Sequence, residues 1–223
     1  MGALEGQIAL VTGASRGIGA AVAKRLAKEG AQLILVARTK KKLEAVDDEI
    51  QEAGGKPATL VPLDLKDSPK IYELADEILK RHSKLDILFG NAGHLGELSP
   101  ITHTSTKLYY EIMEVNCNAN FHLVRAFDPL LQHSKSAKAI FNGSSVAQFG
   151  LPYWGAYSMS KSALEAMVNV YREESKKAGI MVDMYQPGIV ATQMRALAFP
   201  GEDASNLKST DEAAEEFFQK YFT

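Results

Sequence analysis

Short apolar runs alternate with longer amphipathic segments along most of this 223-residue chain. The short runs cover residues 7–12, 32–37, 58–63, 86–90, 139–142 and 181–185. Helical patterns separate them at 17–29, 40–53, 68–81, 105–131 and 155–177. Because the short runs lack polar alternation, we expect strands buried on both faces, and helical connections between strands force parallel pairing. The sequence therefore predicts an α/β fold, a doubly wound parallel sheet of about six strands, with its ligand crevice beyond their carboxyl ends.

The composition suits one globular domain. A formal net charge of -2, with 46% apolar and 23% charged residues, leaves enough apolar side chains to fill a core. No repeat or linker divides the chain. We therefore expect a single domain over 1–223, with its fold core at about 7–195 and a polar C-terminal tail at 200–223, in which no seventh strand is visible.

Several other classes of protein are disfavoured by the same composition. The chain has neither a long uncharged apolar stretch nor a signal-peptide pattern, so we expect no membrane or secreted protein. A single cysteine, Cys117, excludes a disulfide framework and favours a cytoplasmic location. The five histidines lack metal-ligand spacing, and the slightly acidic charge balance argues against nucleic-acid binding.

A glycine-rich loop, Thr-Gly-Ala-Ser-Arg-Gly-Ile-Gly at residues 12–19, joins the first predicted strand to the first predicted helix. Glycines in such a loop permit positive φ and a close approach of the backbone to a pyrophosphate. The following helix offers free N–H groups and a partial positive charge to phosphates. The loop predicts a dinucleotide site, with a tight structural turn as the alternative.

Tyr157 and Lys161 stand four residues apart at the start of a predicted helix, which places both side chains on one face. A phenol titrates near pH 10, and a cation about 4 Å away could lower its pKa by up to roughly three units. The pair therefore predicts a general acid or base. Taken alone, the same spacing also fits a core tyrosine beside a solvated lysine.

Together, the glycine loop and the Tyr-x-x-x-Lys pair resemble the short-chain dehydrogenase/reductase family, over about residues 7–200. The resemblance implies a Rossmann-like fold and a catalytic serine thirteen positions before the tyrosine, which is Ser144, with Ser145 as the alternative. It also implies that Asn116 distorts its helix and holds water in a proton relay. The catalytic residues implied are Asn116, Ser144, Tyr157 and Lys161.

The resemblance also implies a nicotinamide cofactor site spread over successive strand ends. Besides Tyr157 and Lys161, the residues implied are Gly13, Ser15, Arg16, Gly17, Ile18, Gly19, Arg38, Asp64, Leu65, Asn91, Ala92, Gly93, Pro187, Gly188, Ile189 and Thr192.

The end of the second predicted strand bears on the choice of cofactor. An NAD enzyme places a carboxylate there for the ribose 2′-OH, but this chain reads Ala37-Arg38-Thr39. Arg38 and Arg16 can instead grip a 2′-phosphate, because guanidinium groups bind phosphate through two hydrogen bonds. We therefore expect NADP (NADPH) rather than NAD, although a solvated first helical turn would also explain these cations.

Three functions remain compatible with the sequence. The first is an NADP-dependent oxidoreductase that acts on a small-molecule carbonyl or alcohol. The second is its special case, a 3-oxoacyl-[acyl-carrier-protein] reductase, which needs a basic docking surface. The third is a non-catalytic NADP-binding sensor, a kind of family member that usually lacks the tyrosine or the lysine.

The resemblance also bears on assembly and on the substrate wall. Without a seventh strand tetramerisation is in doubt, and we expect a homodimer through two long helices. The stretches 154–157 and 199–203 are similar to those of uncharacterised bacterial oxidoreductases in the family. His94, Tyr153 and Trp154 could line the pocket, or else be a solvated loop residue and two core residues.

Overall fold

A computed structural model describes residues 2–223. One parallel sheet with strand order β3-β2-β1-β4-β5-β6 forms the centre of the molecule. Its strands are β1 (Ile8–Thr12), β2 (Gln32–Ala37), β3 (Thr59–Pro62), β4 (Ile87–Gly90), β5 (Lys138–Asn142) and β6 (Met181–Tyr185). The predicted doubly wound sheet is confirmed. The order reverses between β1 and β4, so the ligand crevice of such a sheet is expected outside the carboxyl ends of these strands.

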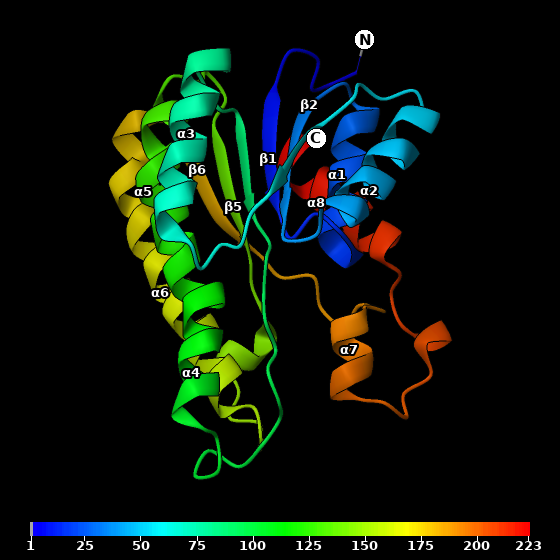
Figure 1. The fold of residues 1–223 in the computed structure, drawn as a ribbon, viewed down its shortest axis with the longest axis vertical. Helices are drawn as coiled ribbons and strands as arrows, with labels where there is room; N and C mark the ends of the chain where they lie inside the picture. The colour runs from blue at the N-terminus through cyan, green and yellow to red at the C-terminus, as the bar shows by residue number, and fades with distance from the viewer. Residues whose placement is uncertain (1) are drawn as a thin grey trace.

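Helices cover both faces of the sheet (Figure 1). One face carries α1 (Gly17–Lys28), α2 (Lys40–Glu52) and α8 (Thr210–Phe222), and the other carries α3 (Ser68–His82), α5 (Ala119–Gln132) and α6 (Gly155–Ser175). Helix α4 (Thr106–Met113) continues into α5 through a π-helical turn, Glu114–Asn118. Three short 3₁₀ segments lie at Ser145–Ala147, Lys176–Ala178 and Ala204–Asn206. None of the helices within residues 2–223 has the length and apolarity needed to cross a membrane.

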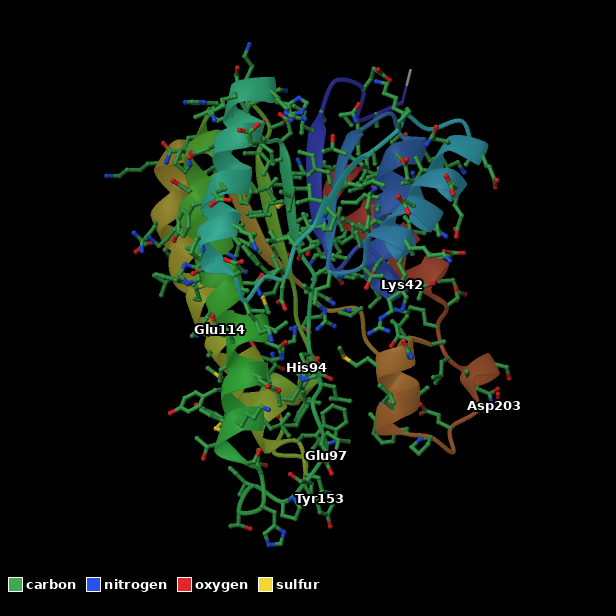
Figure 2. The ribbon with its side chains drawn as sticks, in the orientation of Figure 1. Lys42, His94, Glu97, Glu114, Tyr153 and Asp203 are labelled. Atoms are coloured by element: carbon green, nitrogen blue, oxygen red, sulfur yellow. The ribbon has the colours of Figure 1, made fainter. Side chains whose placement is uncertain are left out.

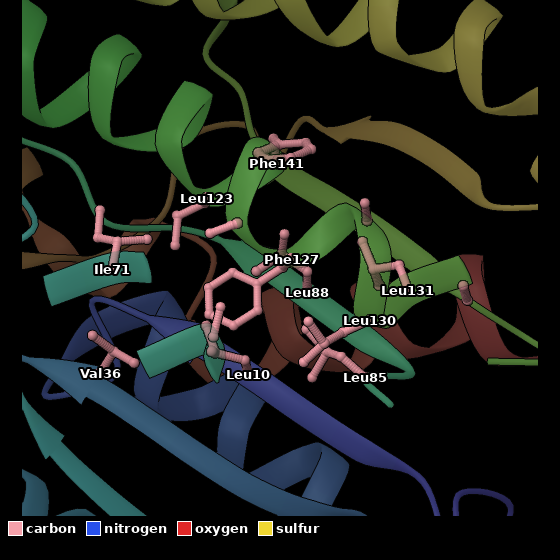
Figure 3. Packing of buried hydrophobic residues seen from close by; sticks show 14 of the residues in the cluster. Leu10, Val36, Ile71, Leu85, Leu88, Leu123, Phe127, Leu130, Leu131 and Phe141 are labelled. Carbon is pink, nitrogen blue, oxygen red and sulfur yellow. The ribbon is translucent and has the colours of Figure 1, made fainter. Parts of the chain in front are cut away.

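Two apolar cores fill the space between the sheet and its helices. Figure 3 shows the core on the α5 side, where Phe127 lies close to Leu88 of β4 and Leu10 of β1. All three side chains are fully buried. Strand residues that face the other way join the second core with α1 and α8. Both faces of the strands are therefore buried, which explains their uniformly apolar sequences.

Helix α8 corrects the expected boundary of the fold core. Ser209 and Glu212 form a capping box at its start, and an apolar face with helical spacing follows. Phe217 on that face is fully buried, with its ring centroid 4.6 Å from that of Phe89 in β4. The hydroxyl of Tyr185 donates to the Ala213 carbonyl oxygen at 2.6 Å. The stretch expected as a polar tail thus contributes a core helix, because the apolar face of α8 packs into the second core with α1 and the sheet.

Helix α7 (Gln193–Ala198) stands apart from both layers, beyond the carboxyl edge of the sheet (Figure 1). The Thr192 side chain caps it by accepting from the backbone N–H of Arg195 at 3.1 Å. The chain then returns toward the sheet through residues 199–209 to reach α8. This excursion forms one wall above the carboxyl ends of the strands, opposite α4 and the loops before α6 (Figure 2).

Candidate active site

The glycine-rich loop passes so close to neighbouring backbone that no side chain fits at Gly13 or Gly19. Gly13 has φ of 63° and Gly17 has φ of 57°, in the left-handed region that favours glycine. A Cβ atom on Gly13 would lie 2.9 Å from the Ala92 Cα, and one on Gly19 would lie 2.5 Å from the Gly13 carbonyl oxygen. The glycines therefore let the loop pack tightly at the start of α1, whose N-terminus offers N–H groups to an anion.

A cleft of about 740 Å³ opens above this loop. Most of the cofactor residues predicted from the sequence line it: Gly13, Ser15, Arg16, Gly17, Ile18, Arg38, Asp64, Leu65, Asn91, Ala92, Gly93 and Thr192. Of the other predicted residues, Gly19 lies buried below the loop. The remaining predicted residues are not among the lining residues of the described chain: Tyr157, Lys161, Pro187, Gly188 and Ile189. The cleft has the size of a nucleotide or dinucleotide site.

One end of the cleft carries a concentration of cations. All four of these cations line the cleft and are exposed: Arg16, Arg38, Lys42 and Lys66. Arg16 also donates to the side-chain oxygen of Gln193 at the start of α7. Lys42 and Lys66 were not among the residues predicted from the sequence, although the Lys40-Lys41-Lys42 run at the start of α2 is a visible signal. Cations at a helix N-terminus are unfavourable unless an anion binds nearby, so this end suits a phosphate.

A polar network links the glycine loop to the end of β5. The Asn91 side chain donates to the Thr12 carbonyl oxygen at 2.9 Å, and the Asn142 amide donates to the Asn91 Oδ1 at 3.2 Å. The Lys161 Nζ donates to the Asn142 carbonyl oxygen at 2.7 Å. Asn142 lines the cleft and was missed in the sequence, where it reads as one more residue of an apolar strand. The network fixes the strand ends on which both halves of the site rest.

Tyr157 and Lys161 lie together in the first turns of α6, and both are buried, with 7% and 3% of their surface exposed. The Lys161 Nζ lies 5.9 Å from the centroid of the Tyr157 ring. The tyrosine hydroxyl lies 3.9 Å from the Met194 sulfur of α7, and Met194 lines the cleft. The two side chains therefore share one face of the helix as predicted, with the tyrosine hydroxyl toward the cleft.

The expected direction of the Tyr157 pKa is wrong for this structure. Burial raises the pKa of Tyr157 to about 12, and the nearby Ser144 side chain acts in the opposite direction without reversing the shift. Burial also lowers the pKa of Lys161 to about 8. Desolvation outweighs the attraction between the two groups, because the ammonium lies away from the hydroxyl and donates to Asn142 instead. Tyr157 is therefore held as a protonated phenol near neutral pH.

Ser144 and Ser145 differ in their surroundings. Ser144 ends the extended segment after β5, with φ of -159°, and its side chain is close enough to the Tyr157 hydroxyl to act on its pKa, which it lowers. Ser145 begins a 3₁₀ turn and is exposed. The geometry favours Ser144, the serine that the thirteen-residue spacing also predicts.

Asn116 is fully buried in the π-helical turn between α4 and α5. Its Oδ1 accepts from the His94 backbone N–H at 2.7 Å, and its Nδ2 donates to the His94 carbonyl oxygen at 2.9 Å. The Nδ2 also donates to Ser160 Oγ, at 2.9 Å, next to Lys161 in the chain. The predicted local distortion of the helix is present. Asn116 joins the loop after β4 to α6, and it makes no direct hydrogen bond to Lys161 within residues 2–223.

Comparisons with known proteins identify the family of this chain. A family model described as short chain dehydrogenase matches residues 7–203. The protein named Uncharacterized oxidoreductase YciK, from Escherichia coli K12, is 39% identical over 208 residues, which cover 92% of this chain and 82% of that protein. The chain belongs to the short-chain dehydrogenase/reductase family of oxidoreductases, as its motifs predict.

Solved structures of related proteins share the whole fold. A Shigella flexneri short chain dehydrogenase complexed with NADP has a TM-score of 0.92 and 37% identity, covering 98% of this chain and 90% of that chain. A short chain dehydrogenase from Escherichia coli CFT073 complexed with NADPH has a TM-score of 0.91 and 37% identity, with the same shares covered.

Proposed function

We propose that this protein is an NADP(H)-dependent oxidoreductase that interconverts a carbonyl compound and its alcohol. The observation that carries the proposal is the burial of Tyr157 and Lys161 side by side, with the Ser144 side chain beside the tyrosine hydroxyl. Burying a phenol and an ammonium costs folding free energy, so such groups are usually kept for a function. Groups with strongly shifted pKa values also cluster at active sites.

Residues in the cleft and beside it fit a nicotinamide dinucleotide. Lys161 has three N–H donors, and one of them reaches the Asn142 carbonyl, so the others are available for the hydroxyl groups of a ribose. Arg16 and Arg38 provide paired donors for a 2′-phosphate. Two related proteins, solved with NADP and with NADPH, support this choice over NAD. The Gly13 loop leaves the room for backbone approach that a pyrophosphate needs.

Each catalytic side chain has a separate task. When bound, the reduced nicotinamide supplies the hydride that the carbonyl carbon accepts. Tyr157, protonated at neutral pH, donates its proton to the carbonyl oxygen, and Ser144 donates a hydrogen bond that positions this oxygen. Lys161 stabilises the negative charge that develops on the phenol oxygen. Asn116 keeps the loop after β4 and the start of α6 in register and supports the return of a proton from water.

Spectrophotometry of NADPH oxidation over a panel of ketones tests the proposal, together with titration of NADPH binding. Turnover of at least one ketone is expected, and it must disappear in Tyr157→Phe while NADPH still binds. Tight binding of NADPH without oxidation on any ketone or acyl thioester would favour a nucleotide-sensing protein instead.

A homodimer is part of the proposal. The outer surfaces of α4, α5 and α6 expose Tyr110, Phe121 and Val170, at 64%, 45% and 57%. Large apolar side chains on neighbouring helices are typical of an interface between subunits. Sedimentation velocity is expected to give a dimer, and Val170→Glu should shift it toward monomer. A wild-type monomer at micromolar concentration would contradict this part of the proposal.

A further inference from the structure

Three segments frame the catalytic end of the cleft, and they hold almost no positive charge. Residues 94–104 and 143–155 contain no lysine or arginine, and residues 186–204 contain only Arg195. The same segments contain three acids, Glu97, Glu202 and Asp203. Figure 2 shows Glu97 on one wall and Asp203 on the other. With one arginine against three carboxylates, the three segments carry a net negative charge.

Arg195 is not free to bind an anionic substrate. Its Nε and one terminal nitrogen donate to the two carboxylate oxygens of Glu202, at 2.5 and 2.6 Å. Its guanidinium also lies 3.7 Å from the centroid of the Phe199 ring. Bidentate pairing and stacking satisfy the charge within α7 and the loop that follows it. This part of the entrance therefore offers a substrate the Phe199 ring and no unpaired cation.

Apolar side chains surround the Tyr157 hydroxyl. Leu95, Val146 and Tyr157 form one buried cluster, and the partly buried Leu98, Trp154, Met194 and Ala198 pack against it. The Trp154 ring lies 5.7 Å from that of Tyr157 and 5.9 Å from that of Phe199. These contacts join the two walls across the entrance, one from the start of α6 and the other from the end of α7. The wall extends outward over Ile101 and Tyr153, which are 63% and 59% exposed.

We propose that the substrate is an uncharged, apolar ketone or its alcohol, with an aromatic ring or a long alkyl chain beside the carbonyl. The inference rests on the proposed function and names the substrate class of the same site. A carboxylate or phosphate on the substrate would meet Glu97 and the paired Arg195 without a partner, whereas a ring would bury apolar surface against Trp154 and Phe199. An acidic acyl carrier protein would lack the basic docking surface that it needs.

Trp154 is the single tryptophan of the chain, so its fluorescence reports directly on ligands at this entrance. The protein loaded with NADP⁺ is titrated with methyl 4-acetylbenzoate and with 4-acetylbenzoate, which carry the same ketone and differ in charge. The neutral ester should bind at least about tenfold more tightly, because burying an unpaired carboxylate is costly. In a series of 2-alkanones, affinity should rise by up to about fourfold for each added methylene that is buried.

Two variants test whether the neutral ester binds at the Phe199 wall. Phe199→Ala keeps the tryptophan and should weaken binding of the neutral ester by about tenfold or more, because the aromatic wall is lost. Leu79→Ala on α3 is the control, since Leu79 is 40% exposed and Phe199 is 37% exposed. It should leave the affinity unchanged. Circular dichroism melting of both variants checks that Phe199→Ala is folded at the assay temperature.

The outcomes separate this inference from the proposed function. Equal or tighter binding of the carboxylate would overturn the apolar substrate class, and reduction of that carboxylate ketone by NADPH would leave the proposed function intact. Quenching by the ester without reduction of any ketone would support the apolar site but contradict the oxidoreductase function. The absence of Trp154 quenching by any ketone would overturn the inference itself.

Discussion

The two ends of the cleft differ in charge and in burial. At the end beside β2 and β3, Arg16 and Arg38 are exposed and charged, on short loops next to the strands. At the end beside β5, Tyr157 and Lys161 are buried under an apolar wall. An exposed guanidinium keeps its charge whatever its surroundings, whereas a buried ammonium or phenol changes its pKa. Under the proposed function, the protein would select its cofactor by charge in solvent and tune its catalytic groups by desolvation.

The largest effect should come from the buried end. Tyr157→Phe removes the proton donor, so kcat for ketone reduction should fall by about 10³-fold, within the range for general acid catalysis. The Kd for NADPH should change by less than about twofold, because the cationic end is untouched. Steady-state kinetics and fluorescence titration measure the two quantities. Retained turnover would place the acid elsewhere and end the contrast between the two ends.

The next effect separates two neighbouring serines at that end. Ser144→Ala removes the hydrogen bond to the carbonyl oxygen and should reduce kcat by about 10² to 10³, by analogy with an oxyanion donor. Ser145→Ala is the matched control. Ser145 is exposed, and its loss should change kcat by about twofold at most. A large loss at Ser145 with normal activity at Ser144 would move the catalytic assignment by one position.

At the cationic end, Arg38→Asp should reverse the cofactor preference. Loss of a charge-assisted hydrogen bond to the 2′-phosphate should weaken NADPH binding by about 10- to 100-fold, while NADH binding improves. Lys40→Asp makes a similar charge change on an exposed residue that does not line the cleft, and it should have little effect. Calorimetric titration with both cofactors measures the change. Equal affinity of the wild-type protein for NADPH and NADH would contradict the role given to the arginines.

The smallest effect is one of pH, and it should appear at one end only. Burial lowers the pKa of Lys161 to about 8, so its ammonium loses its proton as the pH rises through that value. The rate of reduction should then fall by about fivefold from pH 8 to about pH 9, since the fraction of charged lysine falls from about one half to about one eleventh over that unit. Binding of 2′,5′-ADP, which reaches only the cationic end, should stay constant over the same range, because arginine remains charged. If 2′,5′-ADP binding fell together with the reduction rate over this range, the proposed difference between the two ends would be contradicted.

Local sequence patterns predicted most of the fold. The strands of the sheet were visible because each is buried on both faces and reads as a short apolar run, as in Ile8–Thr12 and Gln32–Ala37. Helix α8 was missed because it follows a polar loop. Its signal was nevertheless present, since Ser209 and Glu212 form a capping box ahead of a helically spaced apolar face.

The cofactor residues on the loops were predictable for a similar reason. The glycines of the first loop and Arg38 directly follow a strand end, so their sequence neighbours are enough to place them in the cleft. Met194, Trp154 and Phe199 are different, because each acquires its role from a partner on another element. The sequence shows these residues, but it does not show that α7 brings two of them against the start of α6.

By itself, the sequence determined the parallel sheet, the phosphate loop and the pairing of Tyr157 with Lys161, because strand periodicity, glycine backbone freedom and i, i+4 spacing are local properties. Only the tertiary structure decided the direction of the pKa shifts, the position of Ser144 beside Tyr157, and the apolar wall at the entrance. Burial is the physical reason. A side chain loses its water only when distant segments pack around it, and the free energy of that loss outweighs an interaction between neighbours on one helix.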